Sequence, residues 1–149
     1  MKAYRIGAAA HPVFDGRGAA LYPGRWNRAG QRVIYCGATF AICLLERLCY
    51  TALGRIPAGD KYVAVDIPDR LVERLDPQRL EGWDATESVA ARDFGARWCA
   101  ERRSVALLVP SAVTKLDWNV AINQDHADFG ELAASDETLV EWDRRLFTR

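Results

Sequence analysis

The stretch RVIYCGATFAICLLERLCYTALG, residues 32–54, decides the fold class, because it predicts a strand that passes directly into a helix. Residues 32–37 (RVIYCG) contain β-branched and aromatic side chains after Arg32, typical of a strand that ends at Gly37. Thr39 is placed to cap a helix that runs through about Leu53, where Gly54 stops it.

Outside this unit, strands are expected to outnumber helices. Strands are predicted at residues 2–7, 61–67, 104–109 and 116–122, with another in the tail LVEWDRRLF, residues 139–147. A second helix is predicted at 87–103, a long loop at 10–31 and irregular chain at 69–86. Because helices and strands do not alternate regularly, the order favours an α+β fold over a doubly wound sheet. The whole chain, 1–149, is expected to be a single domain.

Charge, cysteine and histidine content narrow the possible functions. The 20 Lys and Arg balance the 20 Asp and Glu, which removes the bulk electrostatic argument for nucleic acid as a direct partner. No apolar run approaches the ~20 residues of a membrane span, and the first residues lack the apolar region of a signal peptide. The four cysteines and two histidines have no metal-site spacing, so no metal is expected. The apolar neighbours of each cysteine favour buried, reduced thiols in a cytoplasmic protein.

Glu46 is the most informative polar residue in the predicted helix. Its neighbours one turn away on either side are all apolar or aromatic: Ile42, Cys43, Cys49 and Tyr50. A carboxylate on that face is expected to be partly buried, and it then needs a cationic partner or a chemical role. Arg47 and Arg55 are expected to be ordinary solvated charges.

Two loop motifs contain further candidates. GRWNRAG, residues 24–30, offers Arg25 as a fork for a phosphate or carboxylate, with Trp26 filling the core as the alternative. VPSAV, residues 109–113, places Ser111 just after a strand-ending proline, where it binds a ligand or caps a turn. Ser111 is not in a G-x-S-x-G elbow, so a serine hydrolase is disfavoured.

The segment WNVAINQDHADF, residues 118–129, has two asparagines four positions apart. If Asn119 lies in a strand, Asn119 and Asn123 point to the same side of it. Together with His126, their amides either fix a loop or bind a ligand.

These motifs together resemble the RES-domain family, the toxin half of bacterial Xre–RES toxin–antitoxin pairs. The resemblance rests on GRWN-x-x-G with Arg25, LLE with Glu46 and VPSA with Ser111. YRI at residues 4–6, VIY with Tyr35 and N-x-x-x-N followed by HADF support it, so it covers about residues 4–147. The chain departs from the family where PGRW lacks a second glycine before the arginine, and where NQDHADF replaces NP-x-H-x-D-F.

The resemblance implies an ADP-ribosyltransferase-like fold, with small mixed or antiparallel sheets around an NAD cleft, flanked by helices. It implies NAD+ as a substrate, cleaved at the nicotinamide–ribose bond to arrest growth, and a helical Xre-type antitoxin whose end occupies the cleft. Glu46 would stabilise the oxocarbenium-like state, with Arg25 and Ser111 as the other catalytic residues. The NAD-binding residues would be Arg5, Arg25, Tyr35, Ser111, Asn119 and Asn123.

Several alternatives stay open at this stage. The ADP-ribose acceptor is a host protein, water or phosphate, and the sequence does not choose among them. Outside NAD chemistry, an RNase-like toxin would need a basic face and a His or Lys acid–base pair, and only two histidines are present. A non-enzymatic interaction module is the third candidate, against which the intact Arg25, Glu46 and Ser111 argue.

Overall fold

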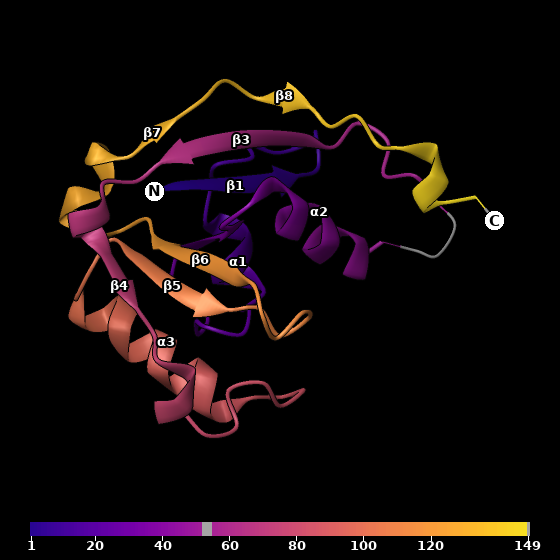
Figure 1. Cartoon of the computed structure of the whole chain (residues 1–149). Coiled ribbons are helices and arrows are strands. Elements are labelled where there is room, and N and C mark those ends of the chain that lie inside the picture. The colour runs from indigo at the N-terminus through magenta and orange to yellow at the C-terminus, as the bar shows by residue number, and fades with distance from the viewer. Residues whose placement is uncertain (52–54, 149) are drawn as a thin grey trace.

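The computed structural model describes residues 1–51 and 55–148, and their strands form one strongly curved mixed sheet (Figure 1). The sheet order is β4-β5-β6-β2-β1-β3-β7, and β8 also pairs with β3. Neighbouring strands are antiparallel except for the parallel pair β4 and β5. The strands are β1 (Lys2–Gly7), β2 (Val33–Gly37), β3 (Lys61–Asp66), β4 (Val72–Arg74), β5 (Ala106–Pro110), β6 (Trp118–Asn123), β7 (Ala133–Ala134) and β8 (Thr138–Leu139).

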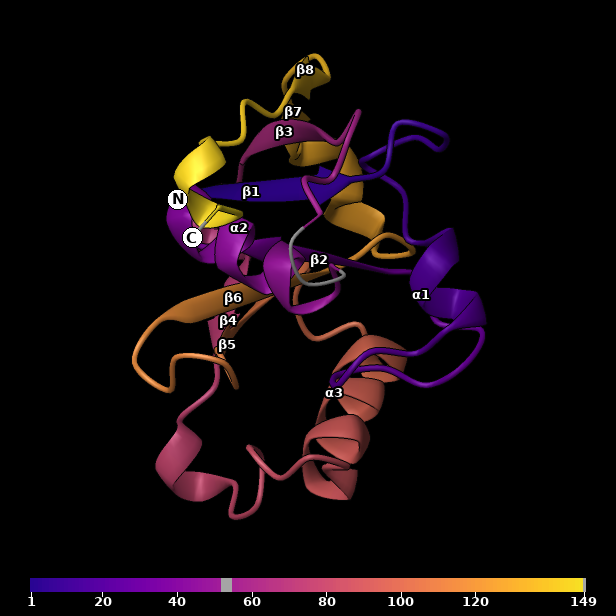
Figure 2. The same ribbon diagram turned by 90° about the vertical axis from the view of Figure 1, so that its right-hand side faces the viewer.

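The helices lie at different parts of this sheet, which confirms the α+β class. They are α1 (Arg17–Leu21), α2 (Phe40–Cys49) and α3 (Val89–Glu101), with short 3₁₀ turns at Asp69–Leu71, Pro77–Arg79, Ala127–Glu131 and Arg144–Leu146. Helix α2 packs against β1 and β2, and α3 lies towards the β4–β5 end of the sheet (Figures 1 and 2). No helix among the described residues is long and apolar enough to cross a membrane.

Two apolar clusters form the core, one on each face of the central strands. The first contains Ile34, Val120 and Ile122 and is covered in part by Phe14 and Phe129. The second packs α3 against β5 and β6 through Trp98 and Leu107. Successive residues of a strand therefore point into different clusters, and the same alternation determines which face the polar residues at the strand ends point to.

The predicted helix after β2 forms as expected at its start. The Thr39 hydroxyl accepts a hydrogen bond from the backbone N–H of Ile42 at 3.2 Å, which is the predicted cap. The helix ends at Cys49, and the predicted stop at Leu53 and Gly54 lies outside the described residues.

Three predictions about elements were wrong or incomplete. The expected loop at 10–31 contains the five-residue α1, too short to produce a periodic pattern. The expected irregular chain at 69–86 contains β4, whose three residues are held by parallel pairing with the distant β5. The tail pairs only as β8, and its later part forms the 3₁₀ turn Arg144–Leu146, because the Asp143 side chain accepts a bond from the Arg145 N–H.

Two predictions about side chains also need correction. Cys36, Cys43 and Cys99 are buried free thiols, but Cys49 is exposed because it lies on the outer side of the last turn of α2. Burial raises the pKa of Cys36 to about 12 and that of Cys99 to about 11. Arg47 is not an ordinary solvated charge, because it forms a forked ion pair of 2.7 and 3.0 Å with the buried Asp60.

Candidate functional site

Glu46 lies where α2 meets the ends of β5 and β6. Oε1 of Glu46 accepts a 2.8 Å hydrogen bond from the Ser111 hydroxyl and a 2.6 Å bond from the Asn119 amide. Ser111 follows the last residue of β5, and Asn119 pairs with Val109 in the β5–β6 ladder, so the antiparallel register brings their side chains to one place. The partners of the Glu46 carboxylate are therefore two neutral donors, and not the cationic partner that was one of the alternatives.

The hydrogen of the Ser111 hydroxyl is committed to Glu46. The Ser111 oxygen accepts bonds from the backbone N–H groups of Val113 (3.1 Å) and Thr114 (3.3 Å), and Ser111 is fully buried. A hydroxyl has one hydrogen and two acceptor positions, so all three are in use. Ser111 thus caps the turn after β5, as one reading of the sequence predicted, and also binds the carboxylate. This geometry supports a serine that orients Glu46 rather than one that attacks a substrate.

The amide of Asn119 is fixed in one orientation by the charge of Glu46. Its Nδ2 faces the carboxylate, since an amide oxygen placed there would repel it. Its Oδ1 is buried and finds no hydrogen-bond partner in the described part of the chain. Within the same residues, no donor reaches Oε2 of Glu46.

Tyr35 holds the GRWN loop in place. Its hydroxyl accepts a bond from the Trp26 N–H at 3.0 Å and donates to Oδ1 of Asn27 at 2.7 Å. A Cβ at Gly24 would lie 2.7 Å from the Tyr35 ring, so only glycine permits this close approach. Burial raises the pKa of Tyr35 well above its ordinary value, which keeps the phenol neutral. Trp26 fills the core with 3% of its surface exposed, as the alternative reading expected.

Arg25 extends from this loop towards the segment that precedes α3. Its Nη1 donates to the carbonyl oxygens of Trp83 (3.0 Å) and Ala85 (2.6 Å). Its Nε and Nη2 make no hydrogen bond to the residues that the structure describes. Backbone carbonyls therefore fix one edge of the guanidinium, and the other edge makes no contact with the described residues.

Arg5 lies on β1, beside the backbone of β2. Its Nη1 donates to the Tyr35 carbonyl oxygen at 3.1 Å, and its Nε is buried without a partner among the described residues. Arg5 is thus next to the strand that carries Tyr35, but none of its hydrogen bonds reaches Glu46, Ser111 or Arg25.

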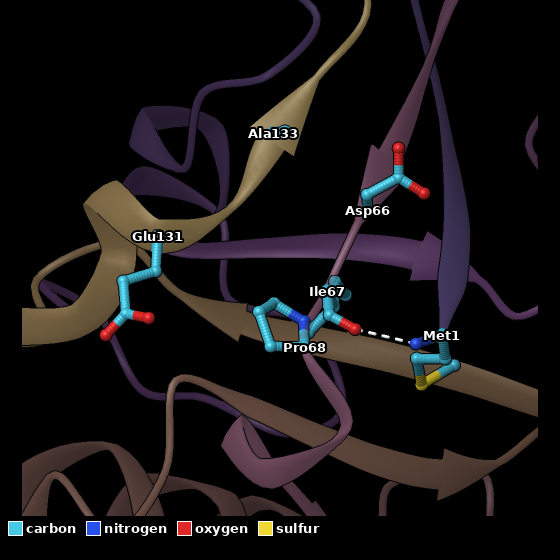
Figure 3. A pocket seen from close by; sticks show the side chains of 6 residues that line it. All are labelled: Met1, Asp66, Ile67, Pro68, Glu131 and Ala133. Atoms are coloured by element: carbon cyan, nitrogen blue, oxygen red, sulfur yellow. Dashed lines mark hydrogen bonds between the residues drawn. The ribbon is translucent and has the colours of Figure 1, made fainter.

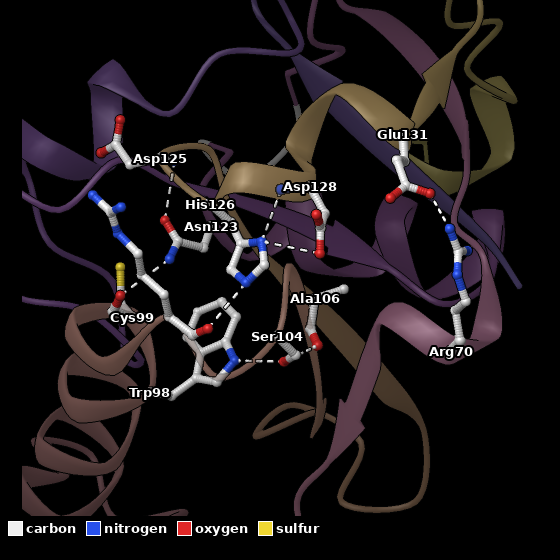
Figure 4. A network of polar contacts seen from close by, with 11 residues as sticks. Arg70, Trp98, Cys99, Ser104, Ala106, Asn123, Asp125, His126, Asp128 and Glu131 are labelled. Carbon is white, nitrogen blue, oxygen red and sulfur yellow. Dashed lines mark hydrogen bonds and ion pairs between the residues drawn. The ribbon is translucent and has the colours of Figure 1, made fainter.

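Asn123 and His126 are not brought to this group (Figure 4). Asn123 is buried at the other end of β6, where its amide donates to the Cys99 carbonyl and accepts from the Asp125 N–H. The His126 Nδ1 accepts from the Asp128 N–H at 3.1 Å, so Nε2 carries the hydrogen that bonds the Arg102 carbonyl at 3.0 Å. Both side chains fix the connection after β6, which was the other reading of this motif.

Two surface hollows of about 350 Å³ lie outside this group of residues. One is lined by Met1, Asp66, Ile67, Pro68, Glu131 and Ala133 (Figure 3). The other lies at the end of β4, where Arg74 stacks over Trp118 at 4.2 Å. Neither contains a predicted site residue. Within the described residues, no cluster of three or more His, Cys, Asp or Glu could hold a metal ion.

Sequence reasoning missed the contacts that hold Arg25, whereas Ser111 and Asn119, the two donors to Glu46, were both predicted as site residues. The segment around Trp83 was predicted only as irregular chain, because its bonds to Arg25 come from backbone carbonyls and leave no residue signature. Lys115, which pairs with Asp84 at 2.6 Å, was also missed. Its position four residues after Ser111 was the one available signal.

Comparison with known proteins gives consistent matches. A family model described as the RES domain matches residues 2–143. The "Prs ADP-ribosylating toxin" of Sphingobium sp. (strain YBL2) is 32% identical over 119 residues, covering 76% of this chain and 74% of that protein. A "Toxin Res" from Photorhabdus laumondii is 30% identical over 119 residues, covering 78% of this chain and 76% of that protein.

A solved structure shares the fold. It is described as the crystal structure of the M. tuberculosis MbcT–MbcA toxin–antitoxin complex, and the match has a TM-score of 0.78 at 20% identity. The match covers 98% of this chain and 86% of that chain, so the architecture is shared along almost the whole length.

Proposed function

The chain belongs to the RES domain family, and from that premise we propose that it is the toxin of a toxin–antitoxin pair. Its proposed activity is cleavage of the nicotinamide–ribose bond of NAD+, which is consumed as a substrate. The names of the relatives as toxins, one of them ADP-ribosylating, support this activity.

The observation that carries the proposal is the hydrogen bonding of the Glu46 carboxylate. Its Oε1 is held by Ser111 and Asn119, while no described residue donates to Oε2. Cleavage of a glycosidic C–N bond passes through an oxocarbenium-like state with positive charge on the ribose. A preorganised, poorly solvated carboxylate stabilises such a charge more strongly than a carboxylate in water does. Nicotinamide leaves as a neutral molecule, so no general acid is required.

The other predicted residues receive roles that fit their contacts. Arg25 offers its free guanidinium edge to a phosphate of NAD+, since guanidinium and phosphate match as a fork. Arg5, whose Nε lacks a partner among the described residues, is a second phosphate candidate. Tyr35, a partly exposed residue whose ring also packs against the second core cluster, is the candidate for stacking on nicotinamide. We leave Asn123 out of the site, because backbone partners occupy both ends of its amide.

We further propose that the ADP-ribose passes to a side chain of a host protein, as the name of the Sphingobium relative suggests for that protein. Water and inorganic phosphate are the competing acceptors, giving NAD+ depletion instead of protein modification. We place the activity in the cytoplasm, where NAD+ and host proteins are both present. The proposed inhibitor is a helical Xre-type antitoxin, and the fold shared with the toxin of a solved toxin–antitoxin complex supports such a partner.

The proposal is tested by incubating the pure protein with NAD+ and measuring free nicotinamide by mass spectrometry. Parallel reactions contain buffer alone, added phosphate, or lysate proteins, and the products ADP-ribose, ADP-ribose 1″-phosphate and modified protein identify the acceptor. Nicotinamide release that depends on Glu46 supports the proposal. If no nicotinamide appears in any reaction, the NAD chemistry is wrong, and the RNase-like toxin and the interaction module become the readings to test.

A further inference from the structure

Lys115 lies at the edge of the candidate site, in the turn that begins at Ser111. Its backbone N–H bonds the Ser111 carbonyl at 2.9 Å, and its backbone is left-handed, with φ of 65°. This turn directs the ammonium group towards the loop before α3. There, Nζ of Lys115 forms a 2.6 Å ion pair with Asp84 and lies 5.6 Å from the centre of the Trp83 ring.

Arg25, which lies far before this loop in the sequence, contacts the same loop. It binds the carbonyls of Trp83 and Ala85, the residues immediately before and after Asp84. The bond from Lys115 lowers the pKa of Asp84 below its ordinary value, and the charge of Arg25 acts in the same direction. Asp84 is thus a carboxylate placed between two cations, one of which the proposed function assigns to a phosphate.

We propose that Lys115 and Arg25 together bind the pyrophosphate of the dinucleotide, and that the Asp84 carboxylate occupies their site until the dinucleotide displaces it. This inference rests on the proposed function for the identity of the ligand. A pyrophosphate carries two negative charges, which match a guanidinium fork and an ammonium point charge that both contact the segment Trp83–Ala85. A carboxylate is the closest protein equivalent of one phosphate group.

The exposure of the pair permits the exchange. The side chains of Lys115 and Asp84 are 50% and 46% exposed, and ion pairs at such exposure contribute little to stability. The ammonium can therefore leave Asp84 for a doubly charged ligand at small cost. Trp83 is only partly exposed and packs against the second core cluster. In the proposed exchange, Trp83 therefore stays in place while the side chain of Asp84 moves away from Lys115.

The two partners of this ion pair should act on ligand binding with opposite sign. Lys115→Gln removes a ligand contact and weakens binding, whereas Asp84→Asn removes a competitor and strengthens it. If the ion pair only stabilised the loop, the two substitutions would change the affinity for the ligand in the same direction, because each breaks the same contact. Lys115→Arg keeps the charge and should restore most of the binding.

The experiment measures binding of ADP-ribose by titration calorimetry, because ADP-ribose contains the pyrophosphate but no bond for the enzyme to cleave. We expect Lys115→Gln to raise Kd roughly tenfold and Asp84→Asn to lower it roughly two- to fivefold. Asp125→Asn is the matched control, because Asp125 pairs with Arg32 at a similar exposure and is outside the site. Its Kd should equal that of the unmodified protein.

The outcomes separate this inference from the proposed function. Opposite shifts for Lys115→Gln and Asp84→Asn support it, whereas equal signs or no change in either variant overturn it. If inorganic phosphate alone shows the opposite shifts and ADP-ribose does not, the site serves a phosphate co-substrate and the assignment to the dinucleotide is wrong. Because the titration needs no turnover, protein that binds ADP-ribose in this pattern but releases no nicotinamide from NAD+ contradicts the proposed function alone.

Discussion

The Ser111 hydroxyl donates to the Glu46 carboxylate across 2.8 Å, joining two residues that are 65 positions apart in the sequence. The same carboxylate oxygen accepts from Asn119, 73 positions away. Helix α2 and the ends of β5 and β6 therefore meet at one oxygen atom. In the proposed reaction, Ser111 and Asn119 act on the substrate through Glu46, and this division of roles can be measured.

Replacing Glu46 by Gln should nearly abolish nicotinamide release while leaving the fold intact. The change removes the negative charge but keeps the size of the side chain. Loss of one preorganised electrostatic group costs ~2.7–4 kcal/mol in the transition state, or roughly a hundred- to a thousandfold in kcat. Steady-state kinetics with NAD+ measures the loss, and circular dichroism checks the fold. Full turnover by a folded Glu46→Gln protein would exclude Glu46 as the catalytic carboxylate.

Ser111→Ala and Asn119→Ala should each lower kcat, because each removes a donor that orients Glu46. A hydrogen bond to a charged group contributes about 1.5–3 kcal/mol, so each loss should be roughly ten- to a hundredfold. In a Glu46→Gln background, the same changes should cost far less, since the group that they orient has lost its charge. Single-turnover measurements on the four proteins of each cycle give the coupling. Losses that simply add would mean that Ser111 or Asn119 acts on the substrate directly.

The sequence predicted the helix of Glu46 well, because a threonine cap and an apolar face are local signals. It also predicted correctly that Glu46 is partly buried, although only Ile42 and Cys43 among its four apolar neighbours are buried and Cys49 and Tyr50 are exposed. The partners of that carboxylate depend on the β5–β6 register, which is a long-range property that no local pattern contains. The same reason explains the missed β4, whose pairing with β5 spans α3, and the unexpected contact of Arg25 with the Trp83 carbonyl.

Arg25→Lys should raise the KM for NAD+ by roughly tenfold or more. Lysine keeps the charge but loses the planar fork, in which Nη1 binds the carbonyls of Trp83 and Ala85 while Nε and Nη2 form a second edge for a phosphate. Initial rates over a range of NAD+ concentrations separate KM from kcat. Arg28→Lys is the matched control in the same loop, because Arg28 pairs with the exposed Asp93 outside the site. Equal KM values for the two variants would contradict the role of Arg25.

Gly95→Ala should destabilise the fold, because a Cβ at Gly95 in α3 would lie 2.0 Å from the Trp26 carbonyl oxygen. The obstacle is backbone and cannot turn aside, so the cost should reach at least the upper part of the ~1–3 kcal/mol typical of overpacking. Gly18→Ala in α1 is the control, since no atom of the described residues lies within 4 Å of its added Cβ. It should be neutral or stabilising by up to about 1 kcal/mol. Urea unfolding of both variants measures the difference, and equal midpoints would contradict the close packing of α3 on the GRWN loop.

The last prediction concerns inhibition by the antitoxin. An enzyme that consumes NAD+ must be blocked in the cell that makes it, and the pair Arg25 and Lys115 offers a site where an acidic side chain or a terminal carboxylate can take the place of a phosphate. We therefore expect the cognate antitoxin to compete with ADP-ribose in a displacement titration. Removing the last few residues of the antitoxin should restore nicotinamide release while the two proteins still copurify, because the rest of the interface remains. A truncated complex that binds ADP-ribose with the affinity of the free toxin and yet stays inactive would show that inhibition acts on the conformation or assembly of the toxin and does not require occupation of the dinucleotide site.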